Sequence, residues 1–391
     1  MKSFRARVVL VTGTSYLVAA FALVSFVILA NKLSQADFGQ FVFILTVVLL
    51  VSDLCDFGTG TSFILQMRDT NREYLKLEQS KFLSIRLGTI ILFAPIVFFL
   101  GVMIFDIGIS FMFTTLVIIT YMRNSIATVL RSEESYVNYL LLMSGEKFIL
   151  IPLILISHST LGILLWASLL AIAAPIIFVY PSIFRITPRI SLNQTFRNFQ
   201  AARMIGIASF VTNVALLFPV IIRFFCGDIA FSNYIFLTKI CSPIPTLGTS
   251  IALVNLSSKE KAFSALKVKR LSNAVMLICL IPLTYFLPYL IQKLTAGKYV
   301  YSYSNVFTVL VIAIAYLLLH ILVSEKLLLM HFSKIIAGYV VFTLIFVLLL
   351  AIIQPGLSLQ LLLFCEFLAI AVALCYFTYQ RLERNEEPRT N

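Results

Sequence analysis

The chain has 391 residues, of which 60% are hydrophobic and only 12% are charged. Soluble proteins carry about a quarter charged residues, so this composition excludes a soluble enzyme or binding domain and predicts a polytopic membrane protein. The formal charge of +13 does not indicate nucleic-acid binding, because the positive-inside rule places Lys and Arg in cytoplasmic loops whatever the function.

Twelve apolar segments follow one another, each long enough to cross a bilayer core of about 30 Å as a helix. The first begins after a basic flank. Ala20–Ala22 within it resembles a signal-peptidase site, but the apolar run continues past that site, so we expect an uncleaved signal anchor. The segments lie at Val8–Ala30, Phe38–Gln66, Phe82–Phe105, Ile109–Leu130, Asn138–Ser157, Thr160–Phe184, Met204–Phe225, Ile229–Val254, Asn273–Gln292, Ser304–Ser324, Lys334–Gln354 and Ser358–Tyr379.

Cations in the loops predict the orientation. With the N-terminus inside, the inner segments hold twenty-two Lys and Arg residues, whereas the outer loops hold only Lys32, Lys293 and Lys298. This asymmetry predicts that both termini are cytoplasmic. The inner loop at 185–203 divides the spans into six and six. We therefore predict an all-α membrane protein with lobes at 1–184 and 204–379 around a central cavity, and a cytoplasmic tail at 380–391.

Five cations fall inside the predicted spans and are the candidates for substrate binding. Arg123 and Lys239 lie deep within their segments, whereas Arg86 and Arg223 lie near a segment end, so that Arg86 could equally be an interfacial anchor. Lys147 is the fifth. A cation at membrane depth needs an anionic partner, which is either a protein carboxylate or a substrate phosphate. Guanidinium and ammonium groups bind phosphate oxygens with charge-assisted hydrogen bonds, so both alternatives stay open.

Four carboxylates inside the spans are candidates for ion coupling or charge pairing: Asp53, Asp56, Glu146 and Glu366. Asp53 and Asp56 are three residues apart and share a helix face, which favours a proton or cation site. The alternatives are pairing with Arg86 or Arg123, or capping of the break at Gly58–Gly60. Glu146 is adjacent to Lys147, and neighbours on a helix point about 100° apart, so we do not expect these two to face each other.

Other sequence features predict a kinked helix and argue against a metal site, a cofactor and direct use of ATP. Pro243 and Pro245 follow Lys239 closely and predict a bent helix that bears a buried lysine, which suits a gated pathway. The three histidines are isolated and the six cysteines form no C-x-x-C pair, so we predict neither a metal site nor another cofactor. The chain has no G-x-x-x-x-G-K-[ST] loop, so direct drive by ATP is not expected.

Two stretches resemble the polysaccharide flippases, the Wzx-type O-antigen exporters of the MATE-like MOP superfamily. Leu29–Ser34 carries a leucine-alanine-x-x-leucine-serine exit, Gln35–Gly39 is a short turn that ends in an aromatic-glycine pair, and Asp56–Gly58 supplies a downstream Asp-x-Gly. Arg223–Asp228, followed by Asn233, Tyr234 and Lys239, looks like the start of the second half in this family. The modest length places the chain nearer the O-antigen exporters than the lipid II flippases.

The resemblance implies that the protein moves an undecaprenyl-diphosphate-linked oligosaccharide from the inner to the outer leaflet of the bacterial inner membrane. It implies alternating access, with ion coupling as an open alternative, and a polysaccharide polymerase and chain-length proteins as candidate partners beside the bilayer. A MATE-like antiporter of cationic drugs shares the fold, but it should have a cavity dominated by carboxylates. A membrane polymerase or ligase typically has a large outer loop, which this sequence lacks, and a structural scaffold would not need buried Arg123 and Lys239.

Overall fold

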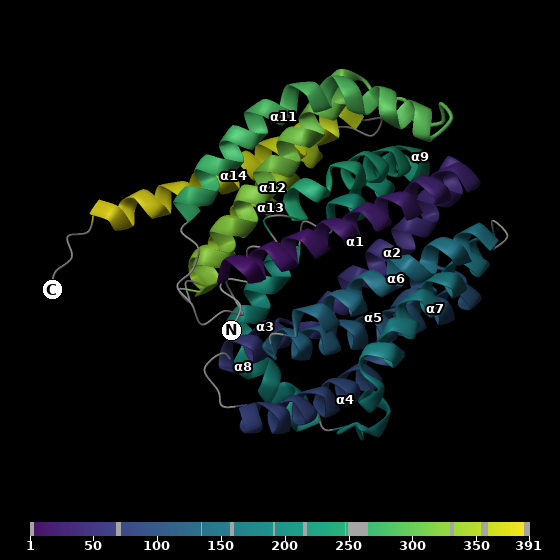
Figure 1. The fold of residues 1–391 in the computed structure, drawn as a ribbon, viewed down its shortest axis with the longest axis vertical. Coiled ribbons are helices and arrows are strands. Elements are labelled where there is room, and N and C mark those ends of the chain that lie inside the picture. The colour runs from purple at the N-terminus through teal and green to yellow at the C-terminus, as the bar shows by residue number, and fades with distance from the viewer. Residues whose placement is uncertain are drawn as a thin grey trace. The chain divides into compact units, whose positions relative to one another are not determined.

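The computed structural model describes residues 4–67, 72–133, 135–156, 160–190, 192–213, 217–246, 248, 265–328, 332–352 and 359–386. All regular structure in these ranges is helical (Figure 1). The helices are α1 (Phe4–Lys32), α2 (Gln35–Asp56), α3 (Thr59–Met67), α4 (Arg72–Ile104), α5 (Ile107–Ser132), α6 (Tyr136–Ile156), α7 (Leu161–Val179), the 3-10 helix η1 (Pro181–Arg185), α8 (Leu192–Asn213), α9 (Leu217–Cys241), α11 (Ala265–Leu294), α12 (Tyr303–Leu328), α13 (Phe332–Ile352) and α14 (Leu359–Glu386).

The helices confirm the all-α membrane class predicted from composition. In the described part of the chain, seven helices are long and apolar enough to cross a bilayer, and two shorter apolar stretches lie at Ser333–Ile345 and Leu363–Tyr379. Each predicted span coincides with part of one or two helices. The prediction of a single helix at Phe38–Gln66 is wrong, because this segment breaks at Phe57 and Gly58 into α2 and α3.

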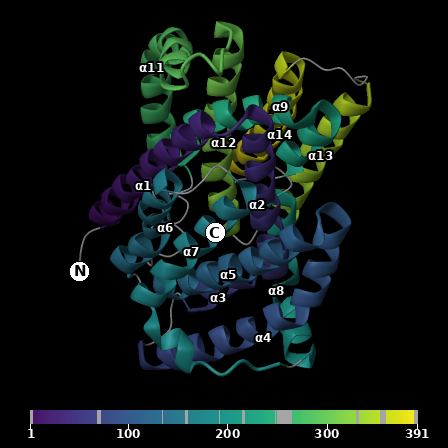
Figure 2. The ribbon, with the colours of Figure 1, turned by 90° about the vertical axis from the view of Figure 1, so that its right-hand side faces the viewer.

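The chain divides into two compact units, and the division falls inside α9, between Ile221 and Ile222. In the first unit α4 packs against α5, and α6 packs against both α1 and α7. Helix α8 lies against α2, α3 and α4, and Figure 2 shows α4 at the bottom of the view with α8 beside it. In the second unit α12 packs against α11, α13 and α14. The start of the predicted C-terminal lobe at Met204 therefore belongs by its contacts to the first unit.

Hydrogen bonds between helix ends agree with the predicted alternation of helix direction. Lys32 Nζ, at the end of α1, donates to the carbonyl oxygens of Ile154 (2.6 Å) and Leu155 (2.8 Å) at the end of α6. In the second unit Gln360 Nε2, at the start of α14, donates to Ser304 Oγ at the start of α12 over 2.9 Å. The predicted topology places the two ends of each pair on one side of the membrane.

The predicted inter-lobe loop at 185–203 is pinned to the first unit. It contains the end of η1, an extended stretch and the first half of α8. Ser84 Oγ of α4 donates to the Thr187 carbonyl, and the Arg189 N–H donates to the Ser84 carbonyl over 3.0 Å. A Cβ placed on Gly88 would lie 2.0 Å from the Arg189 carbonyl oxygen, so only glycine allows this approach. The stretch between the helices is therefore held along α4.

Candidate functional site

The break between α2 and α3 positions the carboxylate of Asp56. Phe57 (φ 44°) and Gly58 (φ 69°) both adopt the left-handed conformation, which turns the chain before α3 begins at Thr59. This conformation is costly for a large side chain and persists only where packing holds it. Asp56 Oδ1 accepts hydrogen bonds from Thr59 Oγ1 (3.1 Å) and the Gly60 N–H (3.2 Å). The carboxylate therefore caps the first turn of α3, one of the alternatives left open by the sequence.

Helix α8 supplies the packing that holds this break. The rings of Phe57 and Phe199 meet edge to face, with their centroids 5.5 Å apart. A Cβ on Gly206 of α8 would lie 2.5 Å from the Phe57 ring, and one on Gly58 would lie 2.9 Å from the backbone of Gly206. The two glycines thus let α8 cross the break at backbone contact.

Arg86 is a buried partner of Asp56 and not an interfacial anchor. It lies in the middle of α4 with 3% of its surface exposed, because α4 begins ten residues before the predicted span. Its Nη1 donates to Asp56 Oδ1 and to Thr59 Oγ1 (2.7 Å), and its Nε donates to Ser125 Oγ (2.7 Å). The guanidinium also lies 4.1 Å from the Tyr121 ring centroid, a cation–π contact. Pairing with Asp56, an alternative weighed from the sequence, is confirmed.

Arg123, Glu146 and Lys147 form a charge triad inside the first unit. Arg123 Nη1 from α5 and Lys147 Nζ both bind the Glu146 carboxylate on α6, one cation on each oxygen. The expectation that Glu146 and Lys147 do not meet is wrong, because their long side chains bridge the angle between their Cβ directions. Arg123 Nε is buried with no hydrogen-bond partner in the described structure. One carboxylate thus serves two cations, and the triad carries a surplus positive charge.

A cavity of about 210 Å³ lies beside the Asp56 and Arg86 pair. Asp53 and Asp56 both line it, as expected from their spacing on one helix face. Arg131 lies in the last turn of α5 and also lines the cavity. Its Nη2 donates to Thr128 Oγ1 over 3.2 Å, and its guanidinium lies 5.8 Å from the Tyr139 ring centroid. The cavity therefore holds acidic and basic side chains together.

The two candidate cations of α9 have different surroundings. The helix is interrupted at Gly227 (φ 79°, ψ 178°), where the sequence predicts a turn between two spans. Arg223 Nε binds Asp228 Oδ1 across this interruption, so it has a local carboxylate partner. The prediction that Lys239 is buried is wrong: it lies in the last turn of α9, which ends at Cys241, and its side chain is exposed.

Glu366 is the buried carboxylate of the second unit. It lies on α14 with 4% of its surface exposed. Tyr234 Oη of α9 donates to its Oε2 over 2.9 Å, and Tyr316 Oη of α12 donates to its Oε1 over 3.1 Å. No Lys, Arg or His within ion-pair distance accompanies it among the described residues. The sequence did not indicate the two tyrosines as its partners, since the three residues lie on helices far apart in the chain.

Neither carboxylate site gathers enough metal-ligating side chains for a metal site in the described part of the chain. Across the described ranges, no group of three or more His, Cys, Asp or Glu side chains is arranged to hold a metal ion. The arrangement instead offers buried charges at two places: a network of ion pairs in the first unit and a carboxylate held by hydroxyl groups in the second.

No protein-family model matches the sequence, and no curated protein matches it either. Solved structures match over nearly their whole length. An outward-facing multidrug resistance transporter of the MATE family, in the MOP superfamily, is 11% identical with a TM-score of 0.67, over 100% of this chain and 98% of that one. An inward-facing MATE transporter is 12% identical with a TM-score of 0.64, over 97% and 99%.

A third similar structure is a MOP superfamily transporter from Pyrococcus furiosus, for which a binding pocket of reverse polarity suggests a different function. It is 14% identical with a TM-score of 0.62, over 97% of this chain and 95% of that one. These likenesses show the fold: this chain has the helical fold of the MATE transporters, whose twelve helices form two lobes. It is a multi-pass membrane protein.

Proposed function

We propose that this chain is a transporter that moves an undecaprenyl-diphosphate-linked oligosaccharide from the inner to the outer leaflet of the bacterial inner membrane by alternating access. Its fold is shared by transporters in outward-facing and inward-facing conformations. For one MOP superfamily transporter of this fold, a binding pocket of reverse polarity suggests a different function, so the fold does not point to cationic drugs alone. No cofactor enters the proposal, and a polymerase and chain-length proteins would receive the flipped unit.

The observation that carries the proposal is the surplus positive charge of the triad. Within the triad Glu146 is shared by Arg123 and Lys147, while Asp53 interacts electrostatically with Arg123 from outside it, and a cation at membrane depth is costly unless an anion neutralises it. Lys147 is the most accessible member, with 22% of its side chain exposed, compared with 7% for Arg123 and 12% for Glu146. A diphosphate that reaches Lys147 would supply the missing negative charge through charge-assisted hydrogen bonds.

The other candidate cations take different roles in this proposal. Arg86 is neutralised by Asp56 and positions the start of α3, so it acts as a positioning residue. Arg123 holds Glu146 and thereby directs Lys147. Arg223 shares its charge with Asp228, and exposed Lys239 is a second contact for the diphosphate along the pathway.

A deletion strain complemented with variants tests this proposal. Loss of surface polysaccharide together with accumulation of lipid-linked repeat units on the inner leaflet is the expected phenotype. Lys147→Gln should reproduce it in part, Lys147→Arg should restore export, and Lys76→Gln, a change at an exposed lysine of α4, should export normally. Normal polysaccharide in the deletion strain would contradict the proposal.

A MATE-like antiporter of cationic drugs is the second candidate, and Glu366 favours it. A buried carboxylate that is held only by hydroxyl groups can accept a cation or a proton without breaking an ion pair. Altered sensitivity of the deletion strain to cationic drugs, with unchanged polysaccharide, would support this alternative. Loss of that phenotype in Glu366→Gln would then assign the coupling to Glu366.

A further inference from the structure

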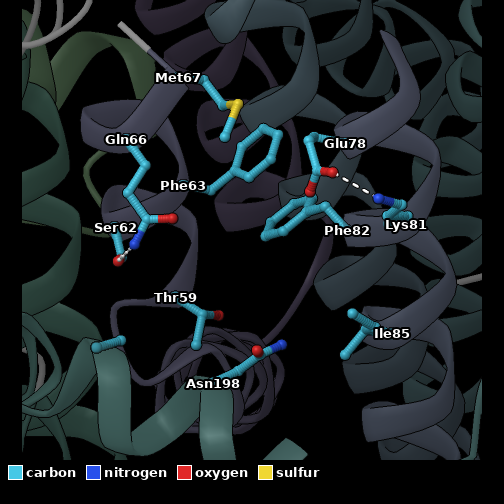
Figure 3. A pocket seen from close by; sticks show the side chains of 11 residues that line it. Thr59, Ser62, Phe63, Gln66, Met67, Glu78, Lys81, Phe82, Ile85 and Asn198 are labelled. Atoms are coloured by element: carbon cyan, nitrogen blue, oxygen red, sulfur yellow. Dashed lines mark hydrogen bonds and ion pairs between the residues drawn. The ribbon is translucent and has the colours of Figure 1, made fainter. Parts of the chain in front are cut away.

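A second cavity of the first unit, of about 360 Å³, lies between α3, α4 and α8 (Figure 3). Its volume is at the small end of the range of about 300–1,000 Å³ that ligand sites occupy. Ser62 and Gln66 of α3, Glu78 and Lys81 of α4 and Asn198 of α8 are among its lining residues. We propose that this cavity binds one sugar ring of the transported oligosaccharide, an inference that rests on the proposed function.

Amide and hydroxyl groups give the cavity its polar side. The Asn198 side chain points into the cavity in Figure 3, and no interaction of this residue is recorded among the described residues. Gln66 Nε2 donates to Ser62 Oγ over 3.2 Å, and both side chains line the cavity in Figure 3. A sugar hydroxyl both donates and accepts, so it matches amides that offer an N–H and a carbonyl oxygen together.

The charges that line the cavity cancel. Lys81 Nζ binds Glu78 Oε1 over 2.7 Å, and among the described lining residues these two alone are charged. A cationic ligand would meet a carboxylate that is already paired, and an anionic ligand would meet a cation that is already paired. The cavity therefore favours an uncharged ligand, in contrast to the triad at Lys147.

An apolar wall completes the cavity. The rings of Phe63 and Phe82 stack with their centroids 4.2 Å apart and an angle of 19° between their planes. Met67 and Ile85 extend this wall. A ligand that fits must combine hydroxyl groups with a C–H surface, and sugar rings have both. A cationic drug would bring a charge for which the paired Glu78 offers no free partner, and bare phosphate lacks the apolar surface.

One residue, Thr59, links the cavity to the ion pair of Asp56 and Arg86. Thr59 lines the cavity and also accepts a hydrogen bond from Arg86 Nη1, while Asp56 accepts one from Thr59. Thr59 thus links the cavity to the Asp56 and Arg86 pair, while the proposal places the diphosphate at Lys147 and a sugar ring in the cavity lined by Asn198.

Binding by the full chain in phosphatidylcholine nanodiscs tests the inference. The probes are undecaprenyl diphosphate alone and undecaprenyl diphosphate that carries glucose, galactose or N-acetylglucosamine. We expect at least one sugar-bearing lipid to bind more tightly than the bare diphosphate. In Asn198→Leu this preference should fall by about tenfold, the effect of one lost hydrogen bond with its unpaired partner, while binding of the bare lipid stays unchanged.

Asn193→Leu is the matched control, since Asn193 is an exposed asparagine on the same helix, five residues before Asn198. Gln66→Leu is the second variant and should give the same selective loss, in case Asn198→Leu does not fold. Equal binding of all four lipids by the wild type, or an unchanged preference in both variants, would overturn the sugar site. Failure of every lipid diphosphate to bind would instead overturn the proposed function.

The glycerol headgroup of a phospholipid also carries several hydroxyl groups and could occupy the cavity. The same experiment distinguishes it from a sugar. If phosphatidylglycerol in the nanodiscs abolishes the preference for sugar-bearing lipid while the bare diphosphate still binds, the cavity belongs to a phospholipid headgroup and the inference is wrong. If the preference persists in phosphatidylglycerol, the occupant is the sugar.

Discussion

The two units hold their buried carboxylates in different ways. In the first unit Asp56 and Glu146 are each bound by a guanidinium, and Glu146 also binds Lys147. In the second unit Glu366 is bound by two tyrosine hydroxyls. Both arrangements give each carboxylate at least one hydrogen-bond donor, but only the first fixes opposite charges against each other. The comparison separates residues that hold the helices in place from residues that stay available to a ligand or an ion.

The backbone around Asp56 also differs from the backbone around Glu366. Asp56 reaches Arg86 because the helix breaks directly after it, at two left-handed residues. Glu366 lies within the continuous helix α14 and meets partners from α9 and α12. The first carboxylate is therefore sensitive to changes in the backbone, whereas the second depends on side-chain donors.

The largest expected effect comes from breaking the pair in the first unit. Arg86→Met leaves the Asp56 carboxylate without its cation and should lower the free energy of unfolding by about 3–5 kcal/mol. Thermal unfolding of the purified protein in nanodiscs measures this, with Arg203→Met, a change at an exposed arginine of α8, as the control. Adding Asp56→Asn to Arg86→Met should recover part of the loss. A loss no larger than that of the control would show that the pair does not stabilise the fold.

Removing the tyrosine hydroxyls that donate to Glu366 should have the next largest effect on the free energy of unfolding. Tyr234→Phe and Tyr316→Phe each remove one hydrogen bond to a buried carboxylate and should cost about 1.5–3 kcal/mol, whereas Tyr303→Phe, at an exposed tyrosine, should cost almost nothing. Repeating both changes in a Glu366→Gln background sharpens the comparison. The cost of each should then fall to about 0.5–1.5 kcal/mol, as for a neutral hydrogen bond. Equal costs in both backgrounds would indicate an uncharged Glu366.

A change at the helix break should act on the first unit alone. Gly58→Ala places a Cβ 2.9 Å from the backbone of Gly206 at a φ of +69°, and should cost about 1–3 kcal/mol. Gly108→Ala is the matched control, because nothing lies within 4 Å of a Cβ there. Thermal unfolding and proteolysis near the break measure the effect. Wild-type stability in Gly58→Ala would mean that the left-handed turn does not hold α3 in place.

The smallest effect on stability is expected at Lys147. Arg123 keeps Glu146 paired when Lys147 is replaced, so Lys147→Gln should change the free energy of unfolding by less than about 1 kcal/mol. Export should nevertheless fall, because the accessible cation is lost. Unfolding in nanodiscs and polysaccharide export are measured on the same variant. A stability loss as large as that of Arg86→Met would make the triad a second structural clamp.

Part of the candidate site was open to prediction from the sequence. Charges inside apolar segments are rare, so Asp56, Arg86, Glu146 and Glu366 stood out by their positions alone. Their spacing along one helix also predicted that Asp53 and Asp56 share a face, and both line one cavity. The pairing of Arg86 with Asp56 could only be named as an alternative, because the two lie thirty residues apart on different helices.

The errors came from side-chain reach and helix ends. Glu146 and Lys147 meet because long side chains bend toward each other, which their Cβ directions do not reveal. Lys239 is exposed, although the sequence placed it deep in a span. A turn at Ser242 separates α9 from a helical stretch at 243–246 that carries Pro243 and Pro245, so the break predicted at the prolines is present. Arg86 is central because α4 begins at Arg72, where the polar sequence obscured the helix. Apolar runs mark membrane depth, but they do not mark where a helix starts or stops.

The sequence by itself determined that this is a helical membrane protein and which few residues carry charge inside it. The reason is physical: a bilayer accepts only long apolar helices, and it makes each buried charge conspicuous. Only the tertiary structure decided which charges neutralise each other, that two tyrosines hold Glu366, and that α3, α4 and α8 line a cavity in which Glu78 and Lys81 are paired. Each of these depends on contacts between helices distant in the chain, and helix periodicity carries no information about which helix faces which.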